Sequence, residues 1–485
     1  MFVNQLPRYE ILSEQALDAI DATWRRLVSE IGVDFQDDGA CDIFAKAGQR
    51  VEGHRVRLDP EYVLERVAQA PETFDMQARN AARSIRVGGS NMVVASFGGP
   101  PFIRRGDKRA EPSLAESSDF VRLCQSFPEI DLVGRVLEPS ELPAETRHLD
   151  LISMLISLCD KPLVGMGGWR TRSEDAIAMA SIVFGGEDRI REKPAIIEAV
   201  NPNSPLRFDD RMIGTLLAFA EARQPVLISP WILMGASSPV TTAAALAQGA
   251  AESLAGIALV QEVSPGCPVV FGTYISNTDL RSGSPALGTP EAMIATLAAG
   301  QFARRFRVPI RIGGDGHTGS QLPDAQAGYE ALMAMIPTFL AGGNFVVDTI
   351  GWLESGLVSS FEKFAIDIEL LRMLEWTFRP LEVNEETLAF DAFEEVGPGG
   401  HFFGCQHTLD RFRTCFYEPL LSSRDNLDRW TRKGNPDTAS RANDIVTSTL
   451  ERFEPPPLDD SVREELDAYC ERRRREIVAS GEIAY

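Results

Sequence analysis

The feature that most constrains the fold of this chain is a repeated pattern of short apolar runs. Several of the runs open near a proline, which removes no ladder hydrogen bond at the first position of a strand. Most are apolar on both faces, as a parallel sheet covered by helices requires. Eight such runs occur, at residues 91–97, 131–136, 161–167, 193–200, 224–229, 267–274, 308–314 and 344–349.

Segments with helical spacing of apolar residues separate these runs. Eight strands alternating with helices over about 260 residues are typical of a (β/α)8 TIM barrel. A doubly wound sheet is the alternative, but no GxGxxG follows the first run, so we favour the barrel. The clearest helical segments are 144–159, 173–184, 209–222, 241–263, 290–306 and 324–341.

The barrel is expected to span residues 91–360, with a helical region on either side. Residues 1–90 are expected to form an N-terminal helical cap, with Asp59 and Pro60 at the start of one helix. Residues 361–485 are expected to form a C-terminal helical region packed on the barrel. Such an extension suits a subunit interface, so we expect a homo-oligomer.

Composition excludes several classes of function. The 485 residues carry a formal charge of −22, which argues against binding nucleic acid or an anionic membrane. The N-terminus has no basic segment before an apolar run, and no stretch of about 18 uninterrupted apolar residues occurs. Seven dispersed cysteines without a CxxC fit a reducing compartment, and a cytoplasmic location is expected.

The active site of a barrel lies at the C-terminal ends of its strands, which directs attention to the loops there. The loop 313–330, GGDGHTGSQLPDAQAGYE, contains His317 together with Asp315, Asp324 and Glu330. It has no lysine or arginine and no GK[ST], which argues against a phosphate site. It also lacks a second histidine at ligand spacing, so no bound metal is expected.

Aromatic residues at the same end of the barrel are more informative. Phe97, Trp169, Trp231, Tyr274 and Trp352 all fall at strand ends or just beyond them. Aromatic faces near a carboxylate form a cage for a quaternary or tertiary ammonium. Packing of the loops against one another would explain any one of these residues equally well.

Motifs spread over nearly the whole chain resemble the trimethylamine methyltransferase superfamily. The resemblance is closer to its branch without pyrrolysine, which includes glycine betaine methyltransferases. It rests on the order and spacing of the motifs rather than on any one of them. They are SEIGVDF (29–35), RHLDLI (147–152), NPNSPL (201–206), DLRSGSPALGTPE (279–291), PDAQAGYE (323–330), GWLESGL (351–357), FEKFAIDIE (361–369), GPGGHFFG (397–404) and RWTRKG (429–434).

The resemblance implies a (β/α)8 barrel that moves a methyl group from a methylated amine to the Co(I) of a corrinoid (cobalamin) carried by a partner protein. Because the chain contains only the ordinary twenty residues, we favour a quaternary, betaine-like amine over trimethylamine. Three alternatives stay open. They are trimethylamine as the donor, an enzyme of the same scaffold with another donor or acceptor such as tetrahydrofolate, and a non-catalytic binder of quaternary amines.

Position relative to the strand ends and to these motifs assigns the site residues. Asp315 and Asp348 would supply negative charge to a cationic nitrogen, although loop carboxylates also serve as caps or salt bridges. His317 would orient a substrate carboxylate or contact the corrinoid. The chain departs from the family pattern at His317, Gly319 and Asp348. The residues expected to bind substrate are Phe97, Glu198, Asn201, Trp231, Tyr274 and Trp352.

Overall fold

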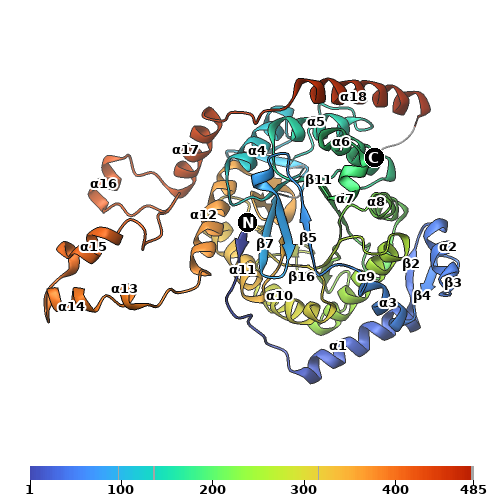
Figure 1. The fold of residues 1–485 in the computed structure, drawn as a ribbon, viewed down its shortest axis with the longest axis horizontal. Coiled ribbons are helices and arrows are strands. Elements are labelled where there is room, and N and C mark those ends of the chain that lie inside the picture. The colour runs from blue at the N-terminus through green and yellow to red at the C-terminus, as the bar shows by residue number, and fades with distance from the viewer. Residues whose placement is uncertain (97, 135–136, 315, 482–485) are drawn as a thin grey trace.

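The computed structural model describes residues 1–96, 98–134, 137–314 and 316–481. A curled parallel sheet surrounded by helices forms its centre (Figure 1). Each of the eight predicted runs contains one strand of this sheet. The strands are β7 (Asn91–Ser96), β10 (Leu132–Val133), β11 (Leu163–Val164), β12 (Ile196–Val200), β14 (Val226–Ile228), β16 (Val269–Thr278), β18 (Ile310–Ile312) and β19 (Phe345–Val346).

Parallel ladders join these strands in the order β18, β16, β14, β12, β11, β10, β7, β19. Asn344, directly before β19, links the two end strands β18 and β19. Its backbone N–H donates to the carbonyl of Ile310 at 2.8 Å, and its Oδ1 accepts from the N–H of Ile310 at 3.1 Å. The predicted α/β class with a parallel sheet is therefore confirmed.

Helices cover the outside of the sheet, and the six clearest predicted helical segments are all helices here. The longest of these six, α9 (Thr242–Val263), is by length and composition able to span a membrane, but 89% of its apolar window is buried inside the fold. The helices that follow the eight strands are α4 (Leu114–Ser126), α5 (Arg147–Leu158), α6 (Arg170–Phe184), α8 (Asp210–Glu221), α9 (Thr242–Val263), α10 (Pro290–Ala303), α11 (Ala325–Ala341) and α12 (Phe361–Thr377).

Apolar side chains from successive strands fill the inside of the sheet. Val93, Leu132, Val164, Leu227 and Phe345 belong to one buried cluster there. The same cluster includes side chains of a hairpin formed by β5 (Thr73–Met76) and β6 (Ile85–Gly88). Packing of this kind leaves room for a pocket only where the strands end.

The N-terminal region is more mixed than the expected helical cap. It contains α1 (Glu14–Arg26), α2 (Asp38–Lys46) and α3 (Pro60–Val67), and Asp59 caps α3 with Pro60 in its first turn as predicted. It also contributes strands to a second, four-stranded sheet, which corrects the purely helical prediction. That sheet consists of β13 (Arg207–Phe208), β2 (Val33–Phe35), β4 (Arg55–Arg57) and β3 (Arg50–Glu52).

The C-terminal region is helical, but it packs on the body only in part. After α12, the helices α17 (Thr438–Glu451) and α18 (Asp460–Ser480) lie against the body, α17 on α12 and α4, and α18 on α5 and α6. The segment between α12 and α17 projects away from the body, which corrects the expectation that the whole region packs on it (Figure 1). Its helices are α13 (Glu385–Leu388), α14 (Phe390–Val396), α15 (Gln406–Arg411) and α16 (Leu427–Arg432).

Two small additions extend the sheet at the C-terminal ends of its strands. The second half of β16 pairs with β15 (Trp231–Met234), which places Trp231 beside Tyr274. Loops that follow β7 and β19 form a four-stranded sheet of β20 (Trp352–Leu353), β21 (Val358–Ser359), β8 (Phe102–Arg105) and β9 (Lys108–Ala110). Both additions carry aromatic residues to one end of the molecule.

Candidate functional site

A pocket of about 300 Å³ lies at the C-terminal ends of the parallel strands. Strand ends from both halves of the sheet contribute to it, so the pocket is centred on the sheet rather than lying to one side. This is the end at which α/β barrels place their active sites. The lining residues are Gly98, Gly99, Gly167, Gly168, Glu198, Ala199, Asn201, Met212, Leu227, Ser229, Trp231, Tyr274, Arg311, His317, Val347, Asp348, Trp352 and Gly356.

Four rings form one wall of the pocket, with His317 in the middle. The His317 ring lies 4.3 Å from Trp352 and 6.2 Å from Trp231, centroid to centroid, and is nearly parallel to Trp231 at 17°. Tyr274 is 6.2 Å from Trp231 and 6.5 Å from His317. Tyr274, His317 and Trp352 are buried, whereas Trp231 is 43% exposed. The wall therefore runs from the interior out to solvent.

Charged groups of both signs face this wall. Arg311 on β18 is only 3% exposed, and its guanidinium carbon lies 5.3 Å from the centre of the Tyr274 ring. Its Nη2 is 3.8 Å from Oδ2 of Asp348. Glu198 is also buried and accepts hydrogen bonds from the N–H of Gly167 at 2.6 Å and from its neighbour Ala199 at 2.9 Å. Among its described residues, the pocket thus combines an aromatic wall with the buried cation of Arg311 and the carboxylates of Glu198 and Asp348.

The backbone at the pocket adopts conformations that side chains rarely favour. Asp348 has φ of 55°, a left-handed conformation that is uncommon outside glycine and asparagine. Gly98 has φ of 146°, and a Cβ there would lie 2.2 Å from Cζ2 of Trp352. Such strain gathers at functional sites, where the surrounding structure has to hold it.

A buried ion pair bonds to the backbone of two loops beside the pocket. Lys363 and Asp367, one turn apart on α12, form a salt bridge with both side chains fully buried. Lys363 Nζ also donates to the carbonyl of Gly316 at 3.1 Å, and Asp367 Oδ2 accepts from the N–H of Gly351 at 2.8 Å. The pair therefore joins the loop after β18 to the loop after β19.

The structure brings together most of the residues expected at the site. Phe97 and Asp315 lie outside the described residues. Trp169 does not line the pocket; it is the N-cap residue of α6, and Arg211 lies over its ring at 5.8 Å. The expected residues that do line the pocket are Glu198, Asn201, Trp231, Tyr274, His317, Asp348 and Trp352.

The other carboxylates of the loop 313–330 have local structural contacts. Asp324 caps α11 by accepting from the N–H of Ala327 at 3.1 Å. Glu330 accepts from the N–H of Gly319 at 2.8 Å and from Gln326 at 2.8 Å. Within the described residues, no group of three or more His, Cys, Asp or Glu side chains converges to suit a metal ion.

Sequence reasoning missed Arg311 and the Lys363–Asp367 pair. Arg311 is the charged residue inside the apolar run VPIRIGG, and this placement in a buried strand was the available signal. Lys363 and Asp367 stand at the i, i+4 spacing of an ordinary surface ion pair. Spacing alone gives no indication that this pair is buried.

Comparison with known proteins finds methyltransferases that are similar over nearly the whole chain. The family model described as trimethylamine methyltransferase (MTTB) matches residues 1–478. A glycine betaine methyltransferase of Desulfitobacterium hafniense is 37% identical over 97% of this chain and 98% of its own length. A proline betaine:corrinoid methyltransferase of Eubacterium limosum is 26% identical over 97% of this chain and 99% of its own.

Solved structures show the likeness in fold. The monomethylamine methyltransferase (MtmB) of Methanosarcina barkeri aligns over 93% of this chain and 90% of its own, with a TM-score of 0.53 and 10% identity. A hydroxylamine complex of MtmB aligns with a TM-score of 0.52, also at 10% identity, over 95% of this chain and 89% of its own. At that identity the likeness extends to the fold alone. The family model and the 37% identical relative both match nearly all of the sequence, so the chain belongs to the trimethylamine methyltransferase (MTTB) family.

Proposed function

We propose that this chain transfers a methyl group from a betaine, a quaternary amine that also carries a carboxylate, to the Co(I) corrinoid of a partner protein. The observation that carries the proposal is the pairing of an aromatic wall with a buried arginine in one pocket. A betaine presents the matching pair of groups, a cation that cannot donate a hydrogen bond and an anion that needs donors. Names among the relatives, glycine betaine and proline betaine methyltransferase, support the same substrate class.

The cationic end would face the rings of Trp231, Tyr274 and Trp352. A quaternary ammonium is attracted by aromatic faces within about 6 Å of the ring centre. Asp348 would add negative charge on the same side. The carboxylate end would be held by Arg311, which is better suited than His317 because its charge is fixed and its planar fork matches a carboxylate. His317 would then position the rings between which it lies.

In methyl transfer of this kind, the main task of the chain would be to bind and orient the substrate. The corrinoid would supply the nucleophile, Co(I). The N–CH₃ bond breaks with its electron pair remaining on nitrogen, so the amine leaves neutral and no protein group has to move a proton. The chain would hold the N–CH₃ bond in line and keep water from the reacting centre, and such positioning accounts for a large share of catalysis.

Pocket size supports a small donor together with a partner that approaches from outside. A volume of about 300 Å³ is at the lower end of the range for small-molecule sites. A corrinoid ring does not fit within it and would have to meet the methyl group at the mouth. Trp231 is exposed there, and Leu280 and Leu357 on neighbouring loops are also exposed. We also propose that the curled sheet forms a closed (β/α)8 barrel, since Asn344 bonds to β18 directly before β19.

Methylation of free Co(I) cobalamin, followed by its absorbance change, tests the proposal. The donors would be glycine betaine, proline betaine, carnitine, choline and trimethylamine. We expect methylation with a carboxylate-bearing quaternary amine and little with choline or trimethylamine. Methylation by trimethylamine alone would overturn the substrate class but keep the reaction. Betaine binding in calorimetry without methyl loss, with and without tetrahydrofolate as acceptor, would indicate a non-catalytic binder.

A further inference from the structure

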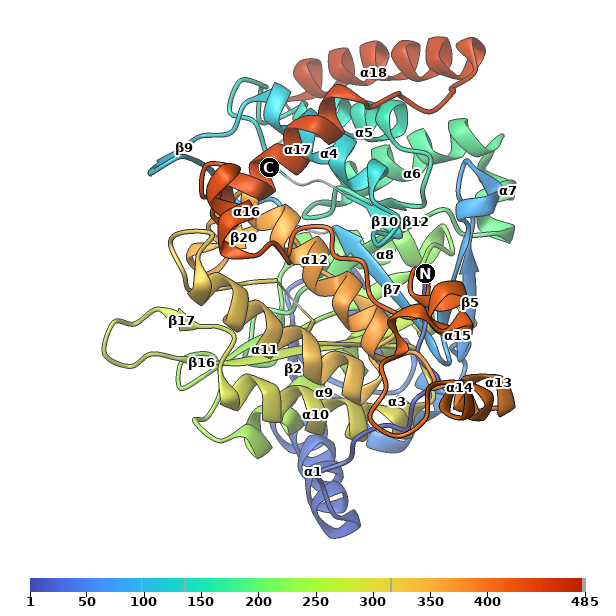
Figure 2. The ribbon, with the colours of Figure 1, turned by 90° about the vertical axis from the view of Figure 1, so that its left-hand side faces the viewer.

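A second cavity, of about 1010 Å³, lies at the N-terminal ends of the parallel strands. Pro194 and Pro268 line it, shortly before β12 and β16 begin. In Figure 2, the elements α7 (Glu187–Glu192) and β5, which also line it, lie at the opposite end of the molecule from β17 (Pro285–Ala286). β17 pairs with the last residues of β16, beyond the Tyr274 that lines the first pocket. We call the second cavity the basal cavity, and it is separate from the pocket of the proposed function.

Four basic side chains line the basal cavity in a chain whose formal charge is −22. They are Arg189, Arg191, Lys193 and Arg223. Within the described part of the chain, none of the four forms a salt bridge with a carboxylate. Arginines elsewhere on the surface are commonly paired, as Arg170 is with Glu174 and Glu221. Cations without such partners, gathered in one cavity, indicate a site for an anion.

The carboxylates at the basal cavity do not cancel this charge. Asp75 on β5 accepts hydrogen bonds of 2.7 and 3.1 Å from Arg86, which does not line the cavity. Those bonds are the main reason why the pKa of Asp75 is lowered, and the charge of Lys193 adds a smaller part. Glu192 is exposed on α7, where solvent screens its charge. The cavity therefore keeps a positive potential.

The backbone that carries these cations is held firmly. Ile190, between two of the arginines, is only 1% exposed, and its carbonyl accepts a hydrogen bond from the buried Gln224 at 2.7 Å. The N–H of Gln77, which follows β5, donates to the carbonyl of Pro194 at 2.7 Å. A helix of six residues such as α7 would not keep its shape alone. These contacts fix the backbone from which the basic side chains extend.

Arg223 is strained and oriented in a way that suits ligand binding. Its φ is 56°, a left-handed conformation that residues other than glycine rarely adopt. Its Nη1 donates to the Oγ of Ser264 at 3.3 Å and to the carbonyl of Pro265 at 3.2 Å. Both bonds use the same nitrogen, so the other edge of the guanidinium can meet a ligand. Backbone strain gathers at such sites, and a planar guanidinium matches the oxygens of a phosphate.

We propose that the basal cavity binds a nucleoside di- or triphosphate, with its phosphates on the four cations and its ring against Phe184. A single phosphate would occupy one or two basic side chains, whereas adjacent phosphates can use all four. Phe184 is half-buried at the end of α6 and lines the cavity together with Pro194 and Pro268. Such apolar faces suit a flat ring. The volume is large enough for both parts of the ligand.

Calorimetric titration of the full chain with ATP, ADP and adenosine in magnesium-free buffer tests the proposal. We expect ATP and ADP to bind with dissociation constants of about 100 µM or lower, and adenosine not to bind detectably. The variant Arg191→Gln/Lys193→Gln should bind ATP about 100-fold more weakly, because each lost charged hydrogen bond costs about tenfold or more. The control Lys46→Gln/Arg475→Gln removes the same charge at exposed residues away from the cavity and should bind ATP like the wild type. Absence of ATP binding in the wild type, or equal affinity in the two variants, would overturn the proposal.

Phe184→Leu tests the ring contact separately, since leucine keeps the apolar packing and removes the aromatic face. ATP should bind about fivefold more weakly to this variant, and inorganic triphosphate should bind as it does to the wild type. Unchanged ATP affinity, or an equal loss for both ligands, would overturn the assignment of a nucleoside. The titrations contain no betaine, so their outcome is independent of the proposed function. Methylation of free cobalamin by Arg191→Gln/Lys193→Gln should proceed at the wild-type rate, because neither residue lines the first pocket.

Discussion

Lys363 Nζ donates a hydrogen bond of 3.1 Å to the carbonyl oxygen of Gly316, one residue before His317. Lys363 is fully buried, and burial lowers its pKa while raising that of its partner Asp367. The cost of burying two charges is offset here by hydrogen bonds to the backbone of two loops. The pair thus acts as a positioning element for the pocket wall and does not itself line the pocket.

Lys363→Met is expected to destabilise the fold by about 3–5 kcal/mol, because it leaves Asp367 as an unpaired buried carboxylate. The double variant Lys363→Met/Asp367→Leu should recover most of this loss of thermal stability. It should not recover the methyl transfer rate, since the loops of Gly316 and Gly351 are no longer held. Lys433→Met, at a half-exposed lysine, is the control. Full recovery of both stability and rate in the double variant would remove the positioning role.

Arg311→Met should discriminate between substrates by their carboxylate. We expect the affinity for glycine betaine to fall about 100-fold, because loss of a charged partner of a buried carboxylate costs 2–5 kcal/mol. Binding of choline, which has no carboxylate, should stay within about threefold or tighten. Calorimetric titration of both ligands measures this. An equal loss for both would indicate a general role for Arg311 in folding.

Asp348→Asn tests the charge without disturbing the backbone, since asparagine tolerates the left-handed conformation at φ of 55°. Choline and tetramethylammonium should each bind about tenfold more weakly, which corresponds to about 1.4 kcal/mol. Asp348→Gly keeps the backbone and removes the side chain, so it should give the same loss. Unchanged affinity in both variants would remove Asp348 from the cation site.

Much of this architecture could be predicted from the sequence. The eight strands were visible because a strand buried on both faces must be an apolar run, and their ends then indicated the pocket loops. The second sheet was not visible, because β2, β3 and β4 are three residues long and carry charges on their exposed face. Its strand β13 pairs with β2 from about 170 residues further along the chain, since Arg207 lies opposite Asp34, and no local pattern reveals a pairing over that distance.

The site was predictable only where side-chain type and strand position agreed. Trp231 and Tyr274 met both conditions and lie side by side. Trp169 met them too, yet the chain turns into α6 at that residue and the ring points to Arg211 instead. Arg311 was missed because a charge within an apolar run is more often read as an interruption than as the functional residue of the run.

Gly98→Ala should displace Trp352, because the new Cβ would lie 2.2 Å from its ring. We expect betaine affinity to fall at least tenfold and tryptophan fluorescence to change. The matched control is Gly186→Ala, which has φ of 122° but no atom within 4 Å of the new Cβ. It imposes strain at a similarly unfavourable backbone conformation without the collision. Similar losses in both variants would assign the effect to strain and not to Trp352.

Glu375 on α12 should make stability depend on pH. Burial, together with the charges of Glu129 and Asp131, raises its pKa to about 7. Between about pH 4.5 and 7 the folded state therefore retains a proton that the unfolded state has lost, so stability falls as pH rises through this window. Glu375→Gln should raise the melting temperature at pH 8 by about 2 °C and by less at pH 5.

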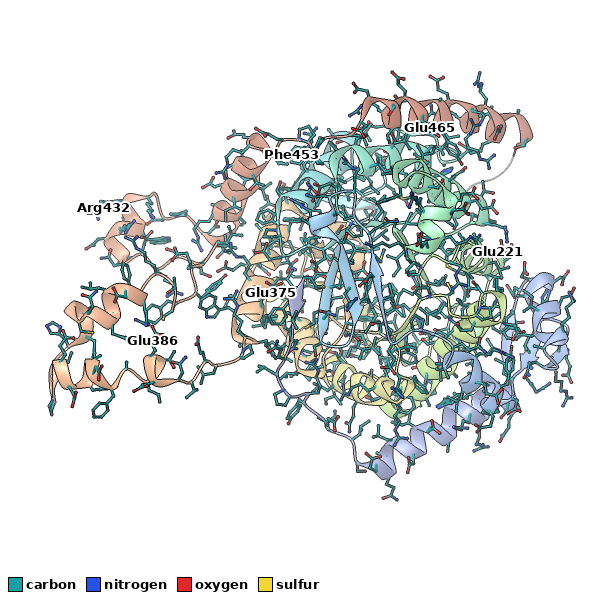
Figure 3. All side chains as sticks on the ribbon, in the orientation of Figure 1. Glu221, Glu375, Glu386, Arg432, Phe453 and Glu465 are labelled. Atoms are coloured by element: carbon teal, nitrogen blue, oxygen red, sulfur yellow. The ribbon has the colours of Figure 1, made fainter. Side chains whose placement is uncertain are left out.

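A melting series from pH 5 to pH 8 checks this sign, with Glu465→Gln as the control. Figure 3 shows both side chains, Glu375 at the root of the projecting segment and Glu465 on the outer helix α18. The control should leave the melting temperature unchanged at every pH. A stabilisation by Glu375→Gln that is larger at pH 5 than at pH 8 would contradict the raised pKa.

The pairing of β19 with β7 also has a consequence for synthesis. Phe345 lies opposite Val93, so the first strand of the sheet receives its last neighbour from about 250 residues further along the chain. A ribosome that has released only the first 300 residues has therefore produced an apolar sheet with an open edge. We expect the nascent chain to depend on chaperones until that strand emerges, and truncations before residue 345 to aggregate rather than fold.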